Sequence, residues 1–274
     1  GLPGATIFYN TANFSSQRIT DRDFFAQGHF ERQLIPQVTI QLNAKYQYSF
    51  THYLDPVYLS SLGKEENFYH QQEGYLNAGV LYNVLHCLSF SFNTDGIISA
   101  LNADLQDFAK PVRYQWLTSV SGKYVNSWVV ASLFTLVDEK VQSGNASKGY
   151  FRVNPFVSAT FKPFNKINLR FRVFYKNIFR LPTFNDLYYG RVGNINLKPE
   201  STNQYNIGVI YQAYLADFLP KVMLSCDVYH NSVKDKIVAY PTKNIYTWTM
   251  LNYGKVSING LDFSGEVAVK PHSK

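Results

Sequence analysis

"VTIQLNAKYQYSFTH" (residues 38–52) decides the fold class of this chain. Its even positions carry Val, Ile, Leu, Ala, Tyr, Tyr, Phe and His, whereas its odd positions carry Thr, Gln, Asn, Lys, Gln, Ser and Thr. Side chains of a β-strand alternate between its two faces, so this stretch predicts a strand with one apolar and one polar face. The alternation lasts about fifteen residues, whereas strands of globular proteins average about five or six. The sequence therefore predicts an unusually long strand.

The same alternation recurs in "FRVNPFVSATF" (151–161), "INLRFRVFY" (167–175) and "LDFSGEVAV" (261–269). Turn-rich stretches separate these segments, and long ones alternate with short ones along the chain. Such an order predicts an antiparallel up-and-down meander of about twelve strands, many of about nine to fifteen residues, and no helix. The long connections are expected at 10–17, 53–73, 94–112, 138–149, 176–203 and 231–252, and the short ones at 31–37, 84–87, 120–122, 162–166 and 215–220.

The composition also favours an all-β protein. The chain is 16% aromatic, with 21 Tyr and 21 Phe, and only 16% charged, whereas soluble domains average about 25% charged. Two cysteines, Cys87 and Cys226, make no disulfide framework. The net charge of +7 is dispersed, with no basic cluster longer than "FKPFNKINLRFR", so no nucleic-acid partner is expected.

Two interpretations of the sheet remain open at this point. Tilted strands of about 9–11 residues cross a bilayer, and closure into a barrel then satisfies every sheet edge. Tyr46, Tyr48 and Phe50 gather at the loop end of their strand, as interfacial aromatic girdles do. A soluble antiparallel barrel or sandwich would show the same alternation. Strand length, unequal loops and aromatic content favour the transmembrane β-barrel, with the lipid bilayer as a partner.

"FRLPTFNDLYYGRVGNINLKPE" (179–200) fills the longest connection in the chain. Leu181-Pro182 and Lys198-Pro199 exclude a regular helix or a central strand at those points, because proline lacks the N–H that a ladder needs and restricts the residue before it. Physical reasoning alone therefore predicts a large structured loop here.

Three pieces of this stretch carry a family resemblance. "FRLPT" (179–183), "DLYY" (186–189) and "GNINLKPE" (193–200), followed by "STNQYNIGVIY" (201–211), resemble the motif of TonB-dependent outer-membrane receptors. The usual form of that motif is close to FRAPT, then LYY, then GNPNLKPE and a strand. "GLPGATIFYN", "FKPFNKINLR" and "GKVSINGLDFSGE" are similar to barrel strands of members from Bacteroidetes.

The resemblance implies a 22-stranded barrel, closed by an N-terminal plug, in the outer membrane of a Gram-negative bacterium. The sequence departs from that pattern because it shows no recognisable plug, about half the strands and no terminal aromatic residue. Residues 1–274 are therefore expected to be an interior part of such a barrel, a partial antiparallel up-and-down transmembrane β-barrel of about twelve of the expected 22 strands.

As function, the resemblance implies active import of a scarce small-molecule or metal-chelate ligand, driven by the TonB energy-coupling complex through the absent plug. An iron chelate (siderophore) or a corrinoid is expected. Haem is disfavoured, because "TFNDLYYGRVG" (183–193) lacks the histidine that haem-importing members carry there. Long loops at 53–73, 94–112, 176–203 and 231–252 are expected to help capture the ligand.

Three groups of site residues follow, each with a simpler alternative. The first group is expected to contact the plug or to order the loop mouth, and consists of Phe179, Arg180, Pro182, Asn194, Lys198 and Glu200; for Arg180 and Glu200 the alternative is a salt bridge inside the loop. The second group is a basic lumen patch that meets plug carboxylates or an anionic ligand, or stays solvated, and consists of Arg152, Lys166, Arg170 and Arg172. The third group stacks on a flat ligand or forms an interfacial girdle, and consists of Tyr240, Tyr246 and Trp248.

No enzyme, cofactor or metal signature stands out. The sequence lacks G-x-S-x-G, H-E-x-x-H, a phosphate loop and a CxxC pair, and His70 with Glu73 would make a poor metal ligand set. The rival to an importer is a self-contained outer-membrane barrel hydrolase of about twelve strands, which needs a serine activated by a histidine. His52, His86 and His230 have no evident serine partner in the sequence. A soluble ligand-binding β-module is the third possibility.

Overall fold

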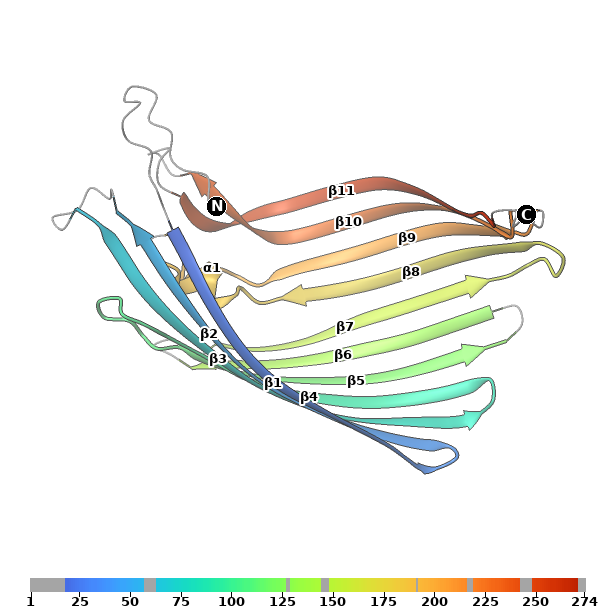
Figure 1. Cartoon of the computed structure of the whole chain (residues 1–274), viewed down its shortest axis with the longest axis horizontal. Coiled ribbons are helices and arrows are strands. Elements are labelled where there is room, and N and C mark those ends of the chain that lie inside the picture. Colours follow the sequence, from blue (N-terminus) through green and yellow to red (C-terminus); the bar gives the residue numbers. More distant parts are fainter. Residues whose placement is uncertain are drawn as a thin grey trace, which may run out of the picture.

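The computed structural model describes residues 18–56, 63–126, 129–143, 148–190, 192–215, 219–241 and 248–270, apart from the side chains of residues 131–148. Within these ranges, eleven strands form one antiparallel sheet in which each strand pairs with the next along the chain (Figure 1). This confirms the predicted all-β, up-and-down fold. The strands are β1 (Arg18–Ile35), β2 (Val38–Asp55), β3 (Glu65–Leu85), β4 (Leu88–Ala103), β5 (Val112–Val125), β6 (Val129–Ser143), β7 (Lys148–Phe161), β8 (Asn168–Arg180), β9 (Glu200–Ala213), β10 (Lys221–Pro241) and β11 (Trp248–Ala268).

The strands are longer and the loops shorter than the sequence suggested. β5 runs through the expected break at 120–122, and β10 has 21 residues. The predicted extent of the long loops was wrong, because several strands continue beyond the stretch in which one face is apolar. In these strand ends both faces carry polar residues, so alternation of apolar and polar residues no longer indicates a strand. The connections at the loop end of the sheet are 56–64, 104–111, 144–147, 181–199 and 242–247, and those at the turn end are 36–37, 86–87, 126–128, 162–167 and 214–220.

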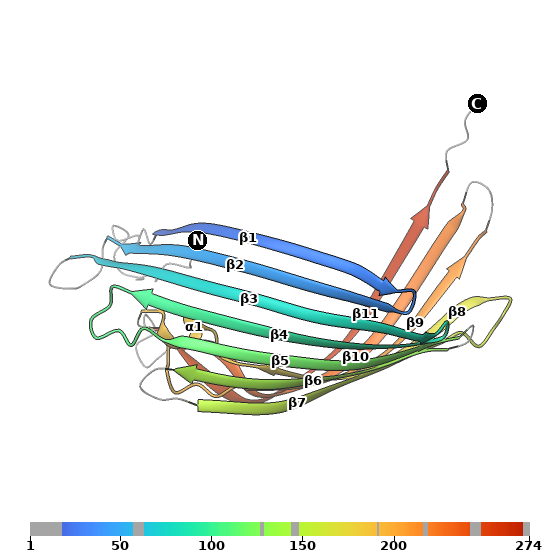
Figure 2. The same ribbon diagram turned by 90° about the horizontal axis from the view of Figure 1, so that it is seen from below.

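The sheet curves into an open trough, with β1 and β11 at its free edges (Figure 2). Its concave face is polar: Asn43 Nδ2 donates to Asn77 Oδ1 (2.8 Å), and Asn77 Nδ2 donates to Asp95 Oδ1 (2.6 Å). Its convex face is apolar, with Leu42 46% and Tyr46 45% exposed. The alternation of residues 38–52 thus places its polar positions inside the trough and its apolar positions outside, as predicted.

One short helix, α1 (Phe184–Tyr188), corrects the expectation of no helix. Thr183 caps it: Asp186 N donates to Thr183 Oγ1 (3.1 Å), and Thr183 N donates to Asp186 Oδ2 (2.8 Å). This reciprocal capping box satisfies backbone donors that the first turn leaves free. Pro182 is compatible with it because the helix begins after the proline.

The buried core lies at the loop end of the concave face, beneath α1. One cluster joins Phe184 to Tyr69, Leu101 and Ala103 of β3 and β4. A second joins Leu187 and Leu197 to Ile237 of β10. Among the described residues, no helix is long and apolar enough to cross a membrane.

Candidate functional site

Residues 181–199, called the lumen segment below, fold into the trough instead of projecting away from it (Figure 1). Gly190 N donates to the Tyr69 hydroxyl of β3 (2.9 Å), and Arg113 Nη2 of β5 donates to Pro182 O (2.8 Å). On the other side, Met250 N of β11 donates to Val192 O (2.8 Å). The segment therefore bridges strands on both sides of the concave face.

Arg113 fixes the N-terminal half of the lumen segment. Its side chain is only 7% exposed, and its guanidinium lies 4.8 Å from the centre of the Phe184 ring. No ion pair to a carboxylate is found for it in the described part of the chain, so the Pro182 carbonyl and the aromatic face stabilise the buried charge. Sequence reasoning missed Arg113, because nothing around it in the chain distinguishes it from other strand arginines.

Asn194 and Lys198 fix the C-terminal half, by different means. Asn194 Nδ2 donates to Met250 O (2.9 Å), whereas Lys198 uses its backbone and leaves its side chain exposed. Asn252 Oδ1 accepts from Lys198 N (2.7 Å), and Asn252 Nδ2 donates to Lys198 O (2.9 Å) and Asp235 O (2.8 Å). Asn252 is thus a second residue that the sequence analysis missed.

Arg180 and Glu200 lie near the two ends of the motif 179–200, and each makes specific polar contacts. Arg180 Nη2 lies 2.9 Å from Asp186 Oδ2, the same oxygen that caps α1. Glu200 is 7% exposed, and its Oε2 accepts from Ile237 N (3.1 Å) while Lys236 Nζ lies 3.5 Å from Oε1. Arg180 thus forms a salt bridge inside the loop, the simpler alternative, whereas Glu200 contacts β10.

Gly193 allows the lumen segment to fold back on α1. A Cβ at this position would lie 2.7 Å from Leu187 O and 2.8 Å from Tyr188 N, both backbone atoms. Only glycine permits this approach, so the first residue of "GNINLKPE" has a steric role that can be read from the structure.

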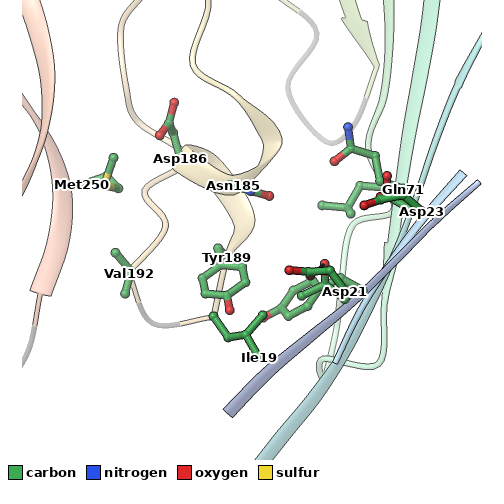
Figure 3. Close-up of a pocket in the computed structure, with 13 residues that line it drawn as sticks. Ile19, Asp21, Asp23, Gln71, Asn185, Asp186, Tyr189, Val192 and Met250 are labelled. Carbon is green, nitrogen blue, oxygen red and sulfur yellow. Dashed lines mark hydrogen bonds between the residues drawn. The ribbon is translucent and has the colours of Figure 1, made fainter. Parts of the chain in front are cut away.

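A cavity of about 520 Å³ lies between the lumen segment and the walls of the trough (Figure 3). Asp21 and Asp23 of β1 enter it from one side, and Asn185 and Tyr189 of the lumen segment from the other. Thr51 Oγ1 donates to Asp21 Oδ1 (2.7 Å). The remaining lining residues are Ile19, Ser49, Tyr69, Gln71, Leu101, Asp186, Val192 and Met250.

Tyr189 supplies a free donor to this cavity. Its hydroxyl is buried and has no hydrogen-bond partner within the described residues. Burial raises the pKa of the Tyr189 hydroxyl, and the nearby Asp21 and Glu65 carboxylates raise it further, so the group stays protonated at neutral pH. A buried donor without a partner is costly, and a ligand acceptor would satisfy it.

The four basic residues predicted as one lumen patch are not brought together. Arg170 and Arg172 share the concave face of β8, and Lys166 lies in the turn that precedes it. Arg152 lies toward the loop end, 5.3 Å from the centre of the Phe179 ring. From the register of β7 and β8, Arg152 is about ten residues from Arg170 along the strands, or about 33 Å.

Arg172 has a specific partner. Its Nη2 lies 2.7 Å from Asp227 Oδ1 of β10, across the intervening Gly208 of β9. A side chain at Gly208 would collide with the Asp227 carboxylate, so the glycine opens the space through which the ion pair reaches.

The aromatic candidates are also separated. Trp248 shares the face of Met250, two residues on, and so faces the trough, whereas Tyr240 pairs with Thr249 on the opposite face. Tyr246 lies outside the described residues. His70 and Glu73 likewise take opposite faces: His70 Nδ1 lies 2.7 Å from the Tyr48 hydroxyl, and Glu73 Oε2 accepts from Ser99 Oγ (3.0 Å). In the described part of the chain, no group of three His, Cys, Asp or Glu residues is arranged to hold a metal.

A long-stranded antiparallel sheet with an apolar convex face, a polar concave face and a loop folded into its lumen is the architecture of part of a membrane β-barrel. The chain belongs to the family described as TonB dependent receptor-like, beta-barrel, whose model matches residues 2–269. Barrels of this family are outer-membrane proteins of Gram-negative bacteria, which confirms the expected location. The family comprises transporters and receptors, not enzymes.

Relatives and solved structures agree with this family. The chain is 36% identical over 84 residues to the vitamin B12 transporter BtuB of Vibrio vulnificus, covering 31% of this chain and 13% of that protein. It is 25% identical over 147 residues to the vitamin B12 transporter BtuB of Photobacterium profundum, covering 52% of this chain and 18% of that protein. The copper transporter OprC superposes with a TM-score of 0.76 at 11% identity, covering 91% of this chain and 44% of OprC. The chain thus spans less than half of that structure.

Proposed function

We propose that this chain forms part of an outer-membrane active importer whose ligand is a corrinoid or an iron chelate. The cavity under the lumen segment carries the proposal, because it offers carboxylates, amides and the unpartnered Tyr189 hydroxyl at the loop end of the lumen. Ligand sites of this kind combine apolar walls with a few convergent polar groups.

The two ligand classes have different support. The similarity to two vitamin B12 transporters favours a corrinoid, and the likeness to the siderophore receptor PirA (TM-score 0.58, 15% identity) is one of fold alone. In the proposed function, residues 1–274 are an interior part of a barrel whose plug and further strands lie elsewhere in the protein. TonB acts through that plug, and the protein comes from a Bacteroidetes species.

The alternatives find less support. A soluble β-module would expose the apolar convex face of the trough to water, where residues such as Leu76 (62% exposed) would be unfavourable. For a hydrolase, His52 instead contacts Glu66 (2.8 Å), and His230 contacts Asn259 Oδ1 (2.6 Å). Neither histidine is paired with a serine in the described part of the chain.

An uptake assay tests the proposal. Cells lacking the full-length protein are expected to lose uptake of labelled cyanocobalamin or of a labelled ferric siderophore, and the gene restores it. Tyr189→Phe is expected to weaken binding of the transported ligand about tenfold, because one hydrogen bond to a buried donor is lost. Tyr211→Phe, on the convex face, is the matched control. Unchanged uptake of both ligands in the deletion strain would refute the proposal.

A further inference from the structure

At the loop end, the convex face of β1–β3 changes from apolar to basic and aromatic. The register places Arg22 opposite Phe50 and, one strand further, His70. Thr20, His52 and Phe68 form the next row toward the loops. A group called the basic rim patch gathers here and consists of Arg18, Arg22, His52, Lys64 and His70.

The patch lies immediately above the apolar band of the same face. On β2 that band runs from Val38 to Tyr48 at alternate positions, a length of about 33 Å along the strand. At a strand tilt of about 40°, it spans about 25 Å, which is the height of the lipid-facing band in outer-membrane barrels. The next row, with Arg22, Phe50 and His70, therefore lies at the level of the lipid headgroups.

This end of the barrel faces the outside of the cell. Outer-membrane barrels place their longer connections on the extracellular side and their short turns on the periplasmic side. The loop end carries 56–64, 104–111 and 181–199, whereas the turn end carries the two-residue turns 36–37 and 86–87. The basic rim patch thus lies in the outer leaflet.

Among the described residues, the two arginines of the patch have no carboxylate partner. Glu66 is already occupied: its Oε1 lies 2.8 Å from His52 Nε2, and its Oε2 lies 2.8 Å from Lys64 Nζ. Arg18 and Arg22 are exposed, and no ion pair is found for either among the described residues. Asp21 and Asp23, their neighbours in β1, point into the cavity on the opposite face.

Neighbouring aromatic side chains contact the two imidazoles of the patch. The rings of His52 and Phe68 stack with centroids 4.6 Å apart, and the Tyr48 hydroxyl lies 2.7 Å from His70 Nδ1. A surface that is rigid, basic and adjacent to an acyl-chain region is complementary to an anionic lipid headgroup.

We propose that the basic rim patch binds the phosphate groups of a phosphorylated glycolipid of the outer leaflet. Arginine recognises phosphate through paired N–H donors. Arg18 and Arg22 share one face of β1 about 13 Å apart, so they suit two separate phosphate groups. The acyl chains of the same lipid lie against the apolar band below.

The test uses the full-length protein, purified in detergent and stripped of lipid. Bis-phosphorylated lipid A, dephosphorylated lipid A and inorganic phosphate are added separately, and the melting temperature and apparent Kd are measured. Three forms are compared: the wild type, Arg18→Gln/Arg22→Gln, and Arg32→Gln. Arg32 is the matched control, since it lies on the same face of β1, ten residues from Arg22 and away from the loop end.

Bis-phosphorylated lipid A is expected to stabilise the wild type and Arg32→Gln alike, and to bind the double variant about tenfold or more weakly. Dephosphorylated lipid A should give little stabilisation. Equal binding to all three forms would overturn the proposal, as would equal stabilisation by inorganic phosphate or by dephosphorylated lipid A. If the double variant does not fold, the same comparison is made with Arg22→Gln.

Discussion

At the scale of single residues, polar side chains form hydrogen bonds with the backbone where the regular β-ladder ends. The pairing of β9 with β10 ends at Ser201 and Lys234, and the next residue, Asp235, has a positive φ of 54°. Glu200 then accepts the Ile237 N–H, and Asn252 donates to the Asp235 carbonyl. These side chains satisfy backbone groups that the interrupted ladder leaves free.

Removing the Glu200 carboxylate should destabilise the protein. Glu200→Ala leaves the Ile237 N–H buried without an acceptor, so the free energy of unfolding is expected to fall by about 2–3 kcal/mol. Glu200→Gln keeps an acceptor and should cost less than half as much. Guanidinium unfolding of the full-length protein in detergent measures both. Equal stability of Glu200→Ala and the wild type would show that the hydrogen bond contributes nothing.

A methyl group at Gly193 should be more disruptive than its size suggests. The neighbouring atoms are backbone atoms of α1, which cannot rotate away, so Gly193→Ala must displace the helix or the segment. A loss of about 2 kcal/mol is expected. Gly254→Ala is the matched control, because a Cβ there meets open space. The prediction fails if the two variants unfold at the same denaturant concentration.

At the scale of elements, the lumen segment is held by contacts to β3, β5 and β11 and not by its own helix. α1 has only five residues, too few to be stable alone. Its order therefore depends on side chains from distant strands, chiefly Arg113, Tyr69 and Asn252.

Releasing one anchor should loosen the whole N-terminal half of the segment. Arg113→Ala removes the hydrogen bond to Pro182 and the contact with Phe184, so amide hydrogen exchange at 184–190 is expected to become at least about tenfold faster. Exchange in β9 should not change. Arg170→Ala is the control, since the Arg170 side chain is exposed and bonds Asn168 two residues away. Unchanged exchange at 184–190 would mean that Arg113 does not hold the segment.

At the scale of the whole molecule, the main feature is the two long outer edges of the sheet, formed by β1 and β11. Within the described residues, β1 pairs only with β2 and β11 only with β10, so the outer edge of each strand has unpaired N–H and C=O groups. Such edges cannot persist in hydrocarbon, where no water can satisfy them. Both edges must therefore be paired in the membrane, and in the proposed larger barrel further strands would pair them.

The native protein should accordingly be larger than this chain. An antibody raised against residues 18–56 is expected to detect, in the outer-membrane fraction of the source cells, a heat-modifiable band of more than twice 31.4 kDa. A band near 31.4 kDa would instead mean that β1 and β11 close on one another or on a second copy, and the proposed domain organisation would be wrong.

The sequence predicted the sheet better than the loops. Alternation at 38–52 correctly assigned the two faces of β2, since its odd-numbered positions, all polar, lie on the concave side. The same criterion failed at 65–73, the start of β3, because both faces are polar or aromatic beyond the bilayer. For the site, the motif 179–200 pointed to the correct segment but not to its anchors.

What the sequence by itself determined is local: the period-two pattern that makes strands, the polarity of each face, and the ordered motif that indicated the family. Only the tertiary structure decided where the strands end, that residues 181–199 fold inward, and which residues hold them there. Arg113 and Pro182 are 69 positions apart, and Asn252 and Lys198 are 54 apart. Such contacts depend on the register and curvature of the whole sheet, which bring distant strands to one side of the lumen and leave no periodic trace in the chain.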